Sequence, residues 1–203
     1  WWINILDQEL YWFDPQKNDN RTFALGQMIG TVVPRESGGL ILALENGVAT
    51  FDPTSETISF VVDPESHISG NRFNDGKCDP DGRFWAGTMS KEEEPNCGTL
   101  YCVHPDGRCE PKLRDLTVSN GIVWTADRST MYFIDSPTRR VDAFDFSADG
   151  TISNRRTAIE IPEGLGFPDG MSIDSDDNLW VGMWSGWCVA KFDPRNGQLL
   201  EKL

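Results

Sequence analysis

The chain has 203 residues, with 32 acidic and 18 basic side chains, and a formal net charge of −14 at neutral pH. Eight Trp and eleven Phe provide enough apolar surface for a buried core, which excludes a disordered chain. The negative charge argues against nucleic acid and anionic membranes as partners, and no apolar run approaches the roughly 20 residues of a membrane-spanning helix. Five irregularly spaced cysteines without a Cys-x-x-Cys pair predict free thiols, no structural zinc site and a cytoplasmic location.

The expected secondary structure is almost wholly β. Residues 1–6 have the pattern of an inner strand, and apolar inner strands are expected again at 83–89 and 178–184. Segments with alternating character lie between them, and Asp-Gly or Asn-Gly turns separate the strands. No stretch has the apolar spacing of a long helix.

A repeat organises these elements. A phrase similar to Phe-Asp-Pro recurs from Phe13 to Phe192, and DPDGRFWAG (79–87) returns as DSDDNLWVG (174–182). The average spacing of roughly 45 residues is that of a four-stranded propeller blade. The second copy begins like a calcium-binding loop, but Leu179 stands where such a loop needs Gly, which predicts a turn. The pattern predicts about four to four and a half blades in one propeller domain over 1–203, truncated at both ends.

Three polar side chains interrupt apolar segments about one blade apart, namely Asn74, Asn120 and Asp169. Side chains at equivalent blade positions converge on the propeller axis. Oxygen donors without His or Cys favour a hard divalent cation such as Ca²⁺, Mg²⁺ or Mn²⁺. The alternative is that these Asn-Gly and Asp-Gly pairs are ordinary tight turns, and spacing alone does not decide between the two.

Several segments are similar to the SMP-30/regucalcin and gluconolactonase family, and the resemblance covers essentially the whole chain. They are RFNDGKCDPDGRFWAGTM (72–89), VSNGIVW (118–124), YFIDS (132–136), FPDGM (167–171) and LWVGMWSGW (179–187). The resemblance implies a six-bladed β-propeller that holds one divalent metal ion (Ca, Zn, Mn or Mg) and hydrolyses a sugar lactone.

The same resemblance implies roles for individual residues. Asn120 and Asp169 match metal ligands, and Asp169 is also the expected catalytic residue that accepts a proton from water. Arg72, Asn74 and Glu92 match groups that hold the substrate. Asp75 matches a polar residue near the site whose role stays open. The family's remaining Glu ligand would lie before residue 1 and is not in this sequence.

The predicted function is that of a metal-dependent, gluconolactonase-like lactonase, a monomer or weak homo-oligomer whose partner is a small-molecule sugar lactone. A non-catalytic calcium-binding propeller would use the same metal ligands. A related propeller that acts on another ester or lactone is the third possibility. Arg72 and Asn74 favour a substrate, because a calcium buffer needs no such pair.

Overall fold

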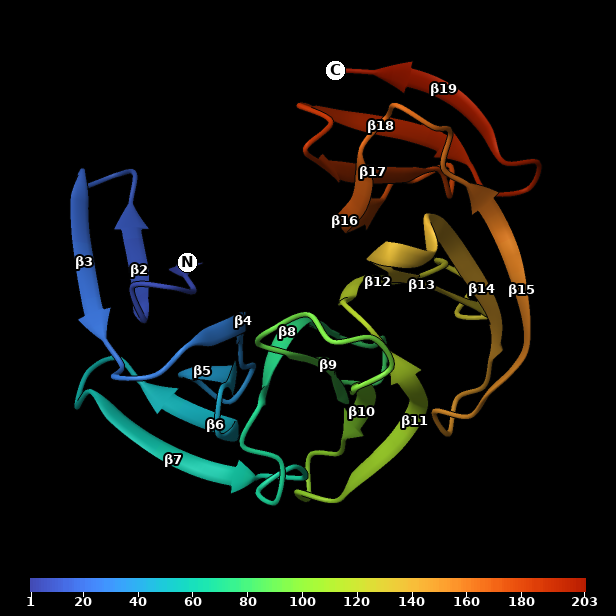
Figure 1. Cartoon of the computed structure of the whole chain (residues 1–203). Coiled ribbons are helices and arrows are strands. Elements are labelled where there is room, and N and C mark those ends of the chain that lie inside the picture. Colours follow the sequence, from blue (N-terminus) through green and yellow to red (C-terminus); the bar gives the residue numbers. More distant parts are fainter.

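The computed structural model describes residues 1–203 as β1 to β19 in five antiparallel sheets, which follow one another around an arc (Figure 1). The only helix is a single 3₁₀ turn, η1 (Ser136–Thr138), and no helix could cross a bilayer. Small sheets in radial succession are the blades of a β-propeller. The predicted all-β propeller is therefore confirmed.

The blades run in chain order. The first has three strands, β1 (Trp2–Asn4), β2 (Glu9–Asp14) and β3 (Asp19–Ala24). The second contains β4 (Ile29–Pro34), β5 (Leu40–Leu44), β6 (Gly47–Asp52) and β7 (Thr57–Val62). The third contains β8 (Asn71–Cys78), β9 (Phe84–Ser90), β10 (Gly98–Val103) and β11 (Cys109–Leu116). The fourth contains β12 (Ser119–Trp124), β13 (Thr130–Asp135), β14 (Arg140–Phe146) and β15 (Ile152–Glu160). The fifth contains β16 (Phe167–Ile173), β17 (Leu179–Trp184), β18 (Cys188–Asp193) and β19 (Gln198–Lys202).

The number of blades differs from the sequence expectation of four to four and a half. There are five, because the short first segment forms a three-stranded sheet that packs through β1 against β4. The count of repeated phrases in the sequence treated this blade as incomplete, because its first strand is short and pairs with β2 over only three residues.

The assignment of inner strands also needs correction. In each four-stranded blade the first strand is the innermost, so β4, β8, β12 and β16 pack side by side around the axis (Figure 1). Segments 83–89 and 178–184, expected as inner strands, belong to the second strands β9 and β17. The most apolar strand is thus the second one of the blade, whose side chains pack in the core between neighbouring blades. The strand β9, for example, is buried throughout and contributes side chains to two core clusters. The innermost strand faces the channel and carries the polar residues.

Candidate functional site

Bulges in three neighbouring inner strands present the polar residues. The register of β8 against β9 shifts at 74–75, that of β12 against β13 at 120–121, and that of β16 against β17 at 169–170. At each position two residues face one residue of the partner strand. A bulge of this kind bends the strand and re-aims a side chain. These sequences are therefore neither regular strands nor chain-reversing turns.

Gly121 lets two of these strands come close together. A Cβ atom at this position would lie 2.8 Å from the backbone nitrogen of Met171 and 2.9 Å from the carbonyl oxygen of Asp169. Because neither backbone atom has room to yield, only glycine fits between β12 and β16 here. The close approach brings the bulges of the fourth and fifth blades to one place.

A cavity of about 600 Å³ opens where these inner strands begin. Of the residues predicted for the site, Arg72, Asn74, Asn120 and Asp169 line it, together with Asp75. Glu92 lies outside the lining, in an exposed loop, and its neighbour Glu93 lines the cavity instead. The remaining lining residues are Ile5, Gly30, Met89, Val118, Ser136, Pro137, Phe167, Gly170 and Trp184.

A continuous chain of hydrogen bonds crosses the cavity from the third blade to the fifth. Arg72 donates from Nη1 to Oδ1 of Asn74 at 2.8 Å, and Asn74 donates from Nδ2 to Oδ1 of Asn120 at 3.1 Å. Asn120 in turn donates from Nδ2 to Oγ of Ser136 at 2.7 Å, and this hydroxyl donates to the carbonyl oxygen of Pro168 at 2.6 Å. Four polar side chains of the third and fourth blades are thereby linked to the backbone of the fifth. The sequence did not point to Ser136, although it lies in the YFIDS segment.

Two carboxylates share the cavity, and both have perturbed acidity. Burial raises the pKa of Asp169, which the backbone N–H of Gly170 partly offsets. Burial also raises the pKa of Asp75, with a further contribution from the charge of Asp169, against the N–H of Gly76 and the ammonium group of Lys77. Low exposure to water disfavours the charged form of each group. A cation in this cavity would relieve that cost.

The available donors suit a hard cation. No group of three or more His, Cys, Asp or Glu side chains is arranged to hold a metal ion. The two predicted ligands that line the cavity are Asn120, which is buried and offers an amide oxygen, and Asp169, which is half-buried and offers a carboxylate. Ca²⁺ takes six to eight oxygen ligands and Mg²⁺ keeps several waters, so two protein ligands make part of such a site. The residues therefore fit a divalent cation that other oxygens also contact.

An aromatic wall borders the cavity on the side of the fifth blade. Phe167 and Trp184 are cross-strand partners whose ring centroids lie 6.0 Å apart. The guanidinium of Arg139 lies 4.9 Å from the centroid of the Phe167 ring. Trp187, in the following turn, is 96% exposed and does not line the cavity. The wall is thus formed by one aromatic pair.

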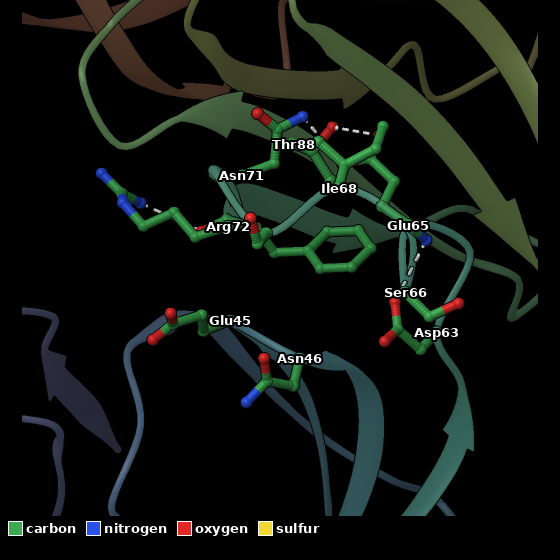
Figure 2. Close-up of a pocket in the computed structure, with 11 residues that line it drawn as sticks. Glu45, Asn46, Asp63, Glu65, Ser66, Ile68, Asn71, Arg72 and Thr88 are labelled. Carbon is green, nitrogen blue, oxygen red and sulfur yellow. Dashed lines mark hydrogen bonds between the residues drawn. The ribbon is translucent and has the colours of Figure 1, made fainter.

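A second, smaller cavity of about 310 Å³ lies beside the first and shares Arg72 with it (Figure 2). Its buried carboxylate, Glu65, accepts hydrogen bonds from Asn71 and Thr88 at 2.9 Å and from the hydroxyl of Tyr101 at 3.0 Å. Burial, together with Glu65, raises the pKa of Tyr101 to about 12. In Figure 2 the side chain of Arg72 extends away from Glu65. The donors around Glu65 satisfy it within the protein, so this group joins strands rather than binding a ligand.

Comparison with known proteins shows the family of this chain. The family model for the SMP-30/Gluconolactonase/LRE-like region matches residues 1–203. The chain belongs to this family. It is similar to the regucalcin of Xenopus laevis, with 36% identity over 205 residues that cover 98% of this chain and 69% of that protein.

Two further proteins are similar at comparable coverage. Bacillus subtilis YvrE, provisionally named a sugar lactone lactonase, is 32% identical over 96% of this chain and 67% of its own length. The solved structure of a calcium-binding protein, regucalcin from Agrobacterium tumefaciens, superposes with a TM-score of 0.93 at 25% identity, covering 100% of this chain and 68% of that one. The chain thus spans about two thirds of the length of these relatives.

Proposed function

We propose that this protein hydrolyses the lactone of a sugar acid, with one divalent cation held by Asn120 and Asp169. The observation that carries the proposal is the chain of hydrogen bonds that joins polar side chains of the third and fourth blades to the backbone of the fifth in one cavity. The names of its relatives, a regucalcin and a sugar lactone lactonase, support the same class of protein.

Asp169 has two roles in this proposal. A divalent cation supplies Lewis-acid polarisation of an ester carbonyl. Asp169 accepts a proton as water attacks the carbonyl carbon of the lactone. When the ring C–O bond breaks, the same proton passes to the departing alkoxide oxygen, which completes the hydroxy acid. Asn120 adds a neutral oxygen, so that the cation keeps more of its positive charge.

Arg72 and Asn74 bind the substrate. The guanidinium of Arg72 is half-buried and bears several donors, of which Nη1 serves the carbonyl oxygen of Phe73 and the amide of Asn74. The others are available for sugar hydroxyls or for the negative charge that develops on the carbonyl oxygen. A sugar hydroxyl that accepts from Arg72 can also donate its own hydrogen, and an acidic side chain of the loop after β9 would accept it. Glu93 lines the cavity and is better located for this than Glu92.

The aromatic wall supports a ring-shaped substrate. Phe167 and Trp184 present apolar ring surface beside the polar groups. The C–H face of a sugar ring packs on such a surface, while its hydroxyls reach Arg72 and Asn74. One molecule can therefore contact both the wall and the polar residues.

Calcium binding without catalysis is the second candidate function. It is favoured by the Agrobacterium relative, which is described as a calcium-binding protein. The same two oxygens, from Asn120 and Asp169, would serve it. Arg72 is the group that separates the candidates, because a cation site gains nothing from a guanidinium in the same cavity.

The test is hydrolysis of D-glucono-δ-lactone by chelator-treated protein to which Ca²⁺, Mg²⁺, Mn²⁺ or Zn²⁺ is returned. Asp169→Asn removes the proton acceptor and a charged ligand, so kcat/KM is expected to fall by about 100-fold or more. Asp174→Asn is the matched control, since this Asp lies at the far end of the same hairpin and outside the cavity. Saturable cation binding without hydrolysis would favour the calcium-binding candidate. Full activity of Asp169→Asn would contradict the assigned role.

A further inference from the structure

Ser136 contacts both of the blades that carry the proposed ligands, yet the proposed reaction assigns it no role. It begins η1, directly after β13, and its side chain is buried while lining the main cavity. Its Oγ accepts from Asn120 at 2.7 Å and donates to the carbonyl oxygen of Pro168 at 2.6 Å. Because Pro168 precedes Asp169, one hydroxyl contacts one proposed ligand and the residue next to the other.

The direction of the donors leaves a single orientation for the amide of Asn120. Arg72 can only donate, so Asn74 turns its oxygen to Arg72 and its NH₂ group to Asn120. Asn120 must then turn its oxygen toward Asn74 and its NH₂ group toward Ser136. The carbonyl of Pro168 can only accept, so the residue between it and Asn120 must accept and donate at once. A hydroxyl does both, whereas a carboxylate or a methyl group does not.

The backbone around Ser136 is itself held firmly. Its N–H donates to the carbonyl oxygen of Val118 at 3.1 Å. The carboxylate of Asp135 accepts from the N–H groups of Thr117 and Val118, at 3.2 Å and 2.9 Å. The hydroxyl is therefore placed by contacts with the segment that leads into β12, the strand of Asn120.

We propose that Ser136 is a positioning residue that sets the amide oxygen of Asn120 and the backbone before Asp169 for cation binding. The inference rests on the proposed function, because that proposal supplies the two ligands. Without the hydroxyl, the NH₂ group of Asn120 and the carbonyl of Pro168 lose their buried partner, and the amide keeps only the 3.1 Å hydrogen bond from Asn74. Loss of such a supporting hydrogen bond typically weakens metal affinity by about 10–100-fold.

The experiment compares Ser136→Ala with Thr138→Val by calorimetric titration of the full chain with Ca²⁺, and by thermal unfolding with and without Ca²⁺. Thr138 is a matched control, because its hydroxyl donates to the carbonyl oxygen of Asp135 at 2.6 Å in the same turn and lies outside the cavity. We expect Ser136→Ala to raise Kd for Ca²⁺ about tenfold or more and to reduce the Ca²⁺-dependent rise in Tm. Thr138→Val should lower Tm with and without Ca²⁺ alike and keep the Kd.

Each outcome decides the proposal. Ser136→Ala protein that binds Ca²⁺ as tightly as the unchanged protein overturns the positioning role, while leaving the metal site intact. Unchanged protein that binds no divalent cation overturns the proposed function and the positioning role together. If Ser136→Ala does not fold, Ser136→Thr is tested in its place, because it keeps the hydroxyl. A Kd for Ca²⁺ within about threefold of the original value supports the role. A roughly tenfold weaker Kd in a variant whose Tm without Ca²⁺ is unaltered contradicts it.

Discussion

The segments 72–87 and 167–182 are two copies of one unit, in the third and fifth blades, and their side chains agree best in the turn and at the start of the second strand. In both copies an Asp side chain closes the turn by accepting from two backbone N–H groups and one indole Nε1. For Asp79 these donors belong to Asp81, Arg83 and Trp85, and for Asp174 they belong to Asp176, Asn178 and Trp180. The repeat is thus a structural feature that stabilises the first hairpin of these two blades.

The inner strands of the two copies differ where the site lies. Arg72 of the third blade corresponds to Phe167 of the fifth, and both line the cavity. The guanidinium group of one copy is thus replaced by an aromatic ring in the other. Asp75 corresponds to Gly170, and a Cβ at Gly170 would lie 3.9 Å from the Asp75 carboxylate. Lys77, which donates to the carbonyl oxygen of Met171 at 3.0 Å, has no charged counterpart. The repeated part builds the blade, and the residues that depart from the repeat make the site.

The largest expected difference between the copies concerns the stability of the turn. Asp79 is buried and pairs at 2.5 Å with Arg83, which is buried as well. Asp79→Ala removes the buried carboxylate from that guanidinium and leaves it only the partly exposed Asp81 at 3.1 Å and a carbonyl oxygen, so we expect a loss of about 3 kcal/mol in the free energy of unfolding, measured with urea. Asp174→Ala should cost clearly less, because Asp174 pairs with Lys191 where water reaches both groups. Equal losses would show that burial does not distinguish the copies.

A second expected difference concerns the cavity. Arg72→Gln removes the charge but keeps polar donors, so kcat/KM for D-glucono-δ-lactone should fall by about 10–100-fold, the size of a hydrogen bond to a charged group. Most of the loss should be in KM if Arg72 binds hydroxyls, and in kcat if it stabilises the oxyanion. Arg139→Gln is the control, because Arg139 lies over Phe167 and outside the cavity lining. Comparable losses in the two variants would place the substrate on the aromatic side.

The smallest expected effect is the pH dependence of the Asp174 turn. The hydrogen bond from Lys191, followed by those of the turn, holds the pKa of Asp174 well below its ordinary value of 3.8. A carboxyl with a lowered pKa in the folded state contributes stability above its unfolded pKa and loses it as the pH falls. The stability difference between the unchanged protein and Asp174→Asn should therefore shrink between about pH 5 and pH 2. A difference that stays constant over this range would contradict the assigned ion pair.

Local chemistry explains why much of the fold could be predicted. The turn at Asp79 uses donors only two to six positions along the chain, so its sequence pattern carries its structure. The polar residues Asn74, Asn120 and Asp169 are visible because each interrupts apolar segments. Glu93 was missed because the acidic run from Glu92 onward contains no signal that tells its members apart, and only the path of the loop directs one of them to the cavity.

The sequence by itself determined that this protein is a propeller of blades about 45 residues long and which positions in each blade are polar, because turns and strand periodicity depend on neighbours in the chain. Tertiary structure decided which strand is innermost and how the polar groups meet. Asn74 reaches Asn120 across 46 residues, and Ser136 reaches Pro168 across 32. These contacts form only when the blades pack against one another. The bulges that aim the side chains into the cavity shift the strand register by one residue, and the alternation of apolar and polar residues does not mark where they occur.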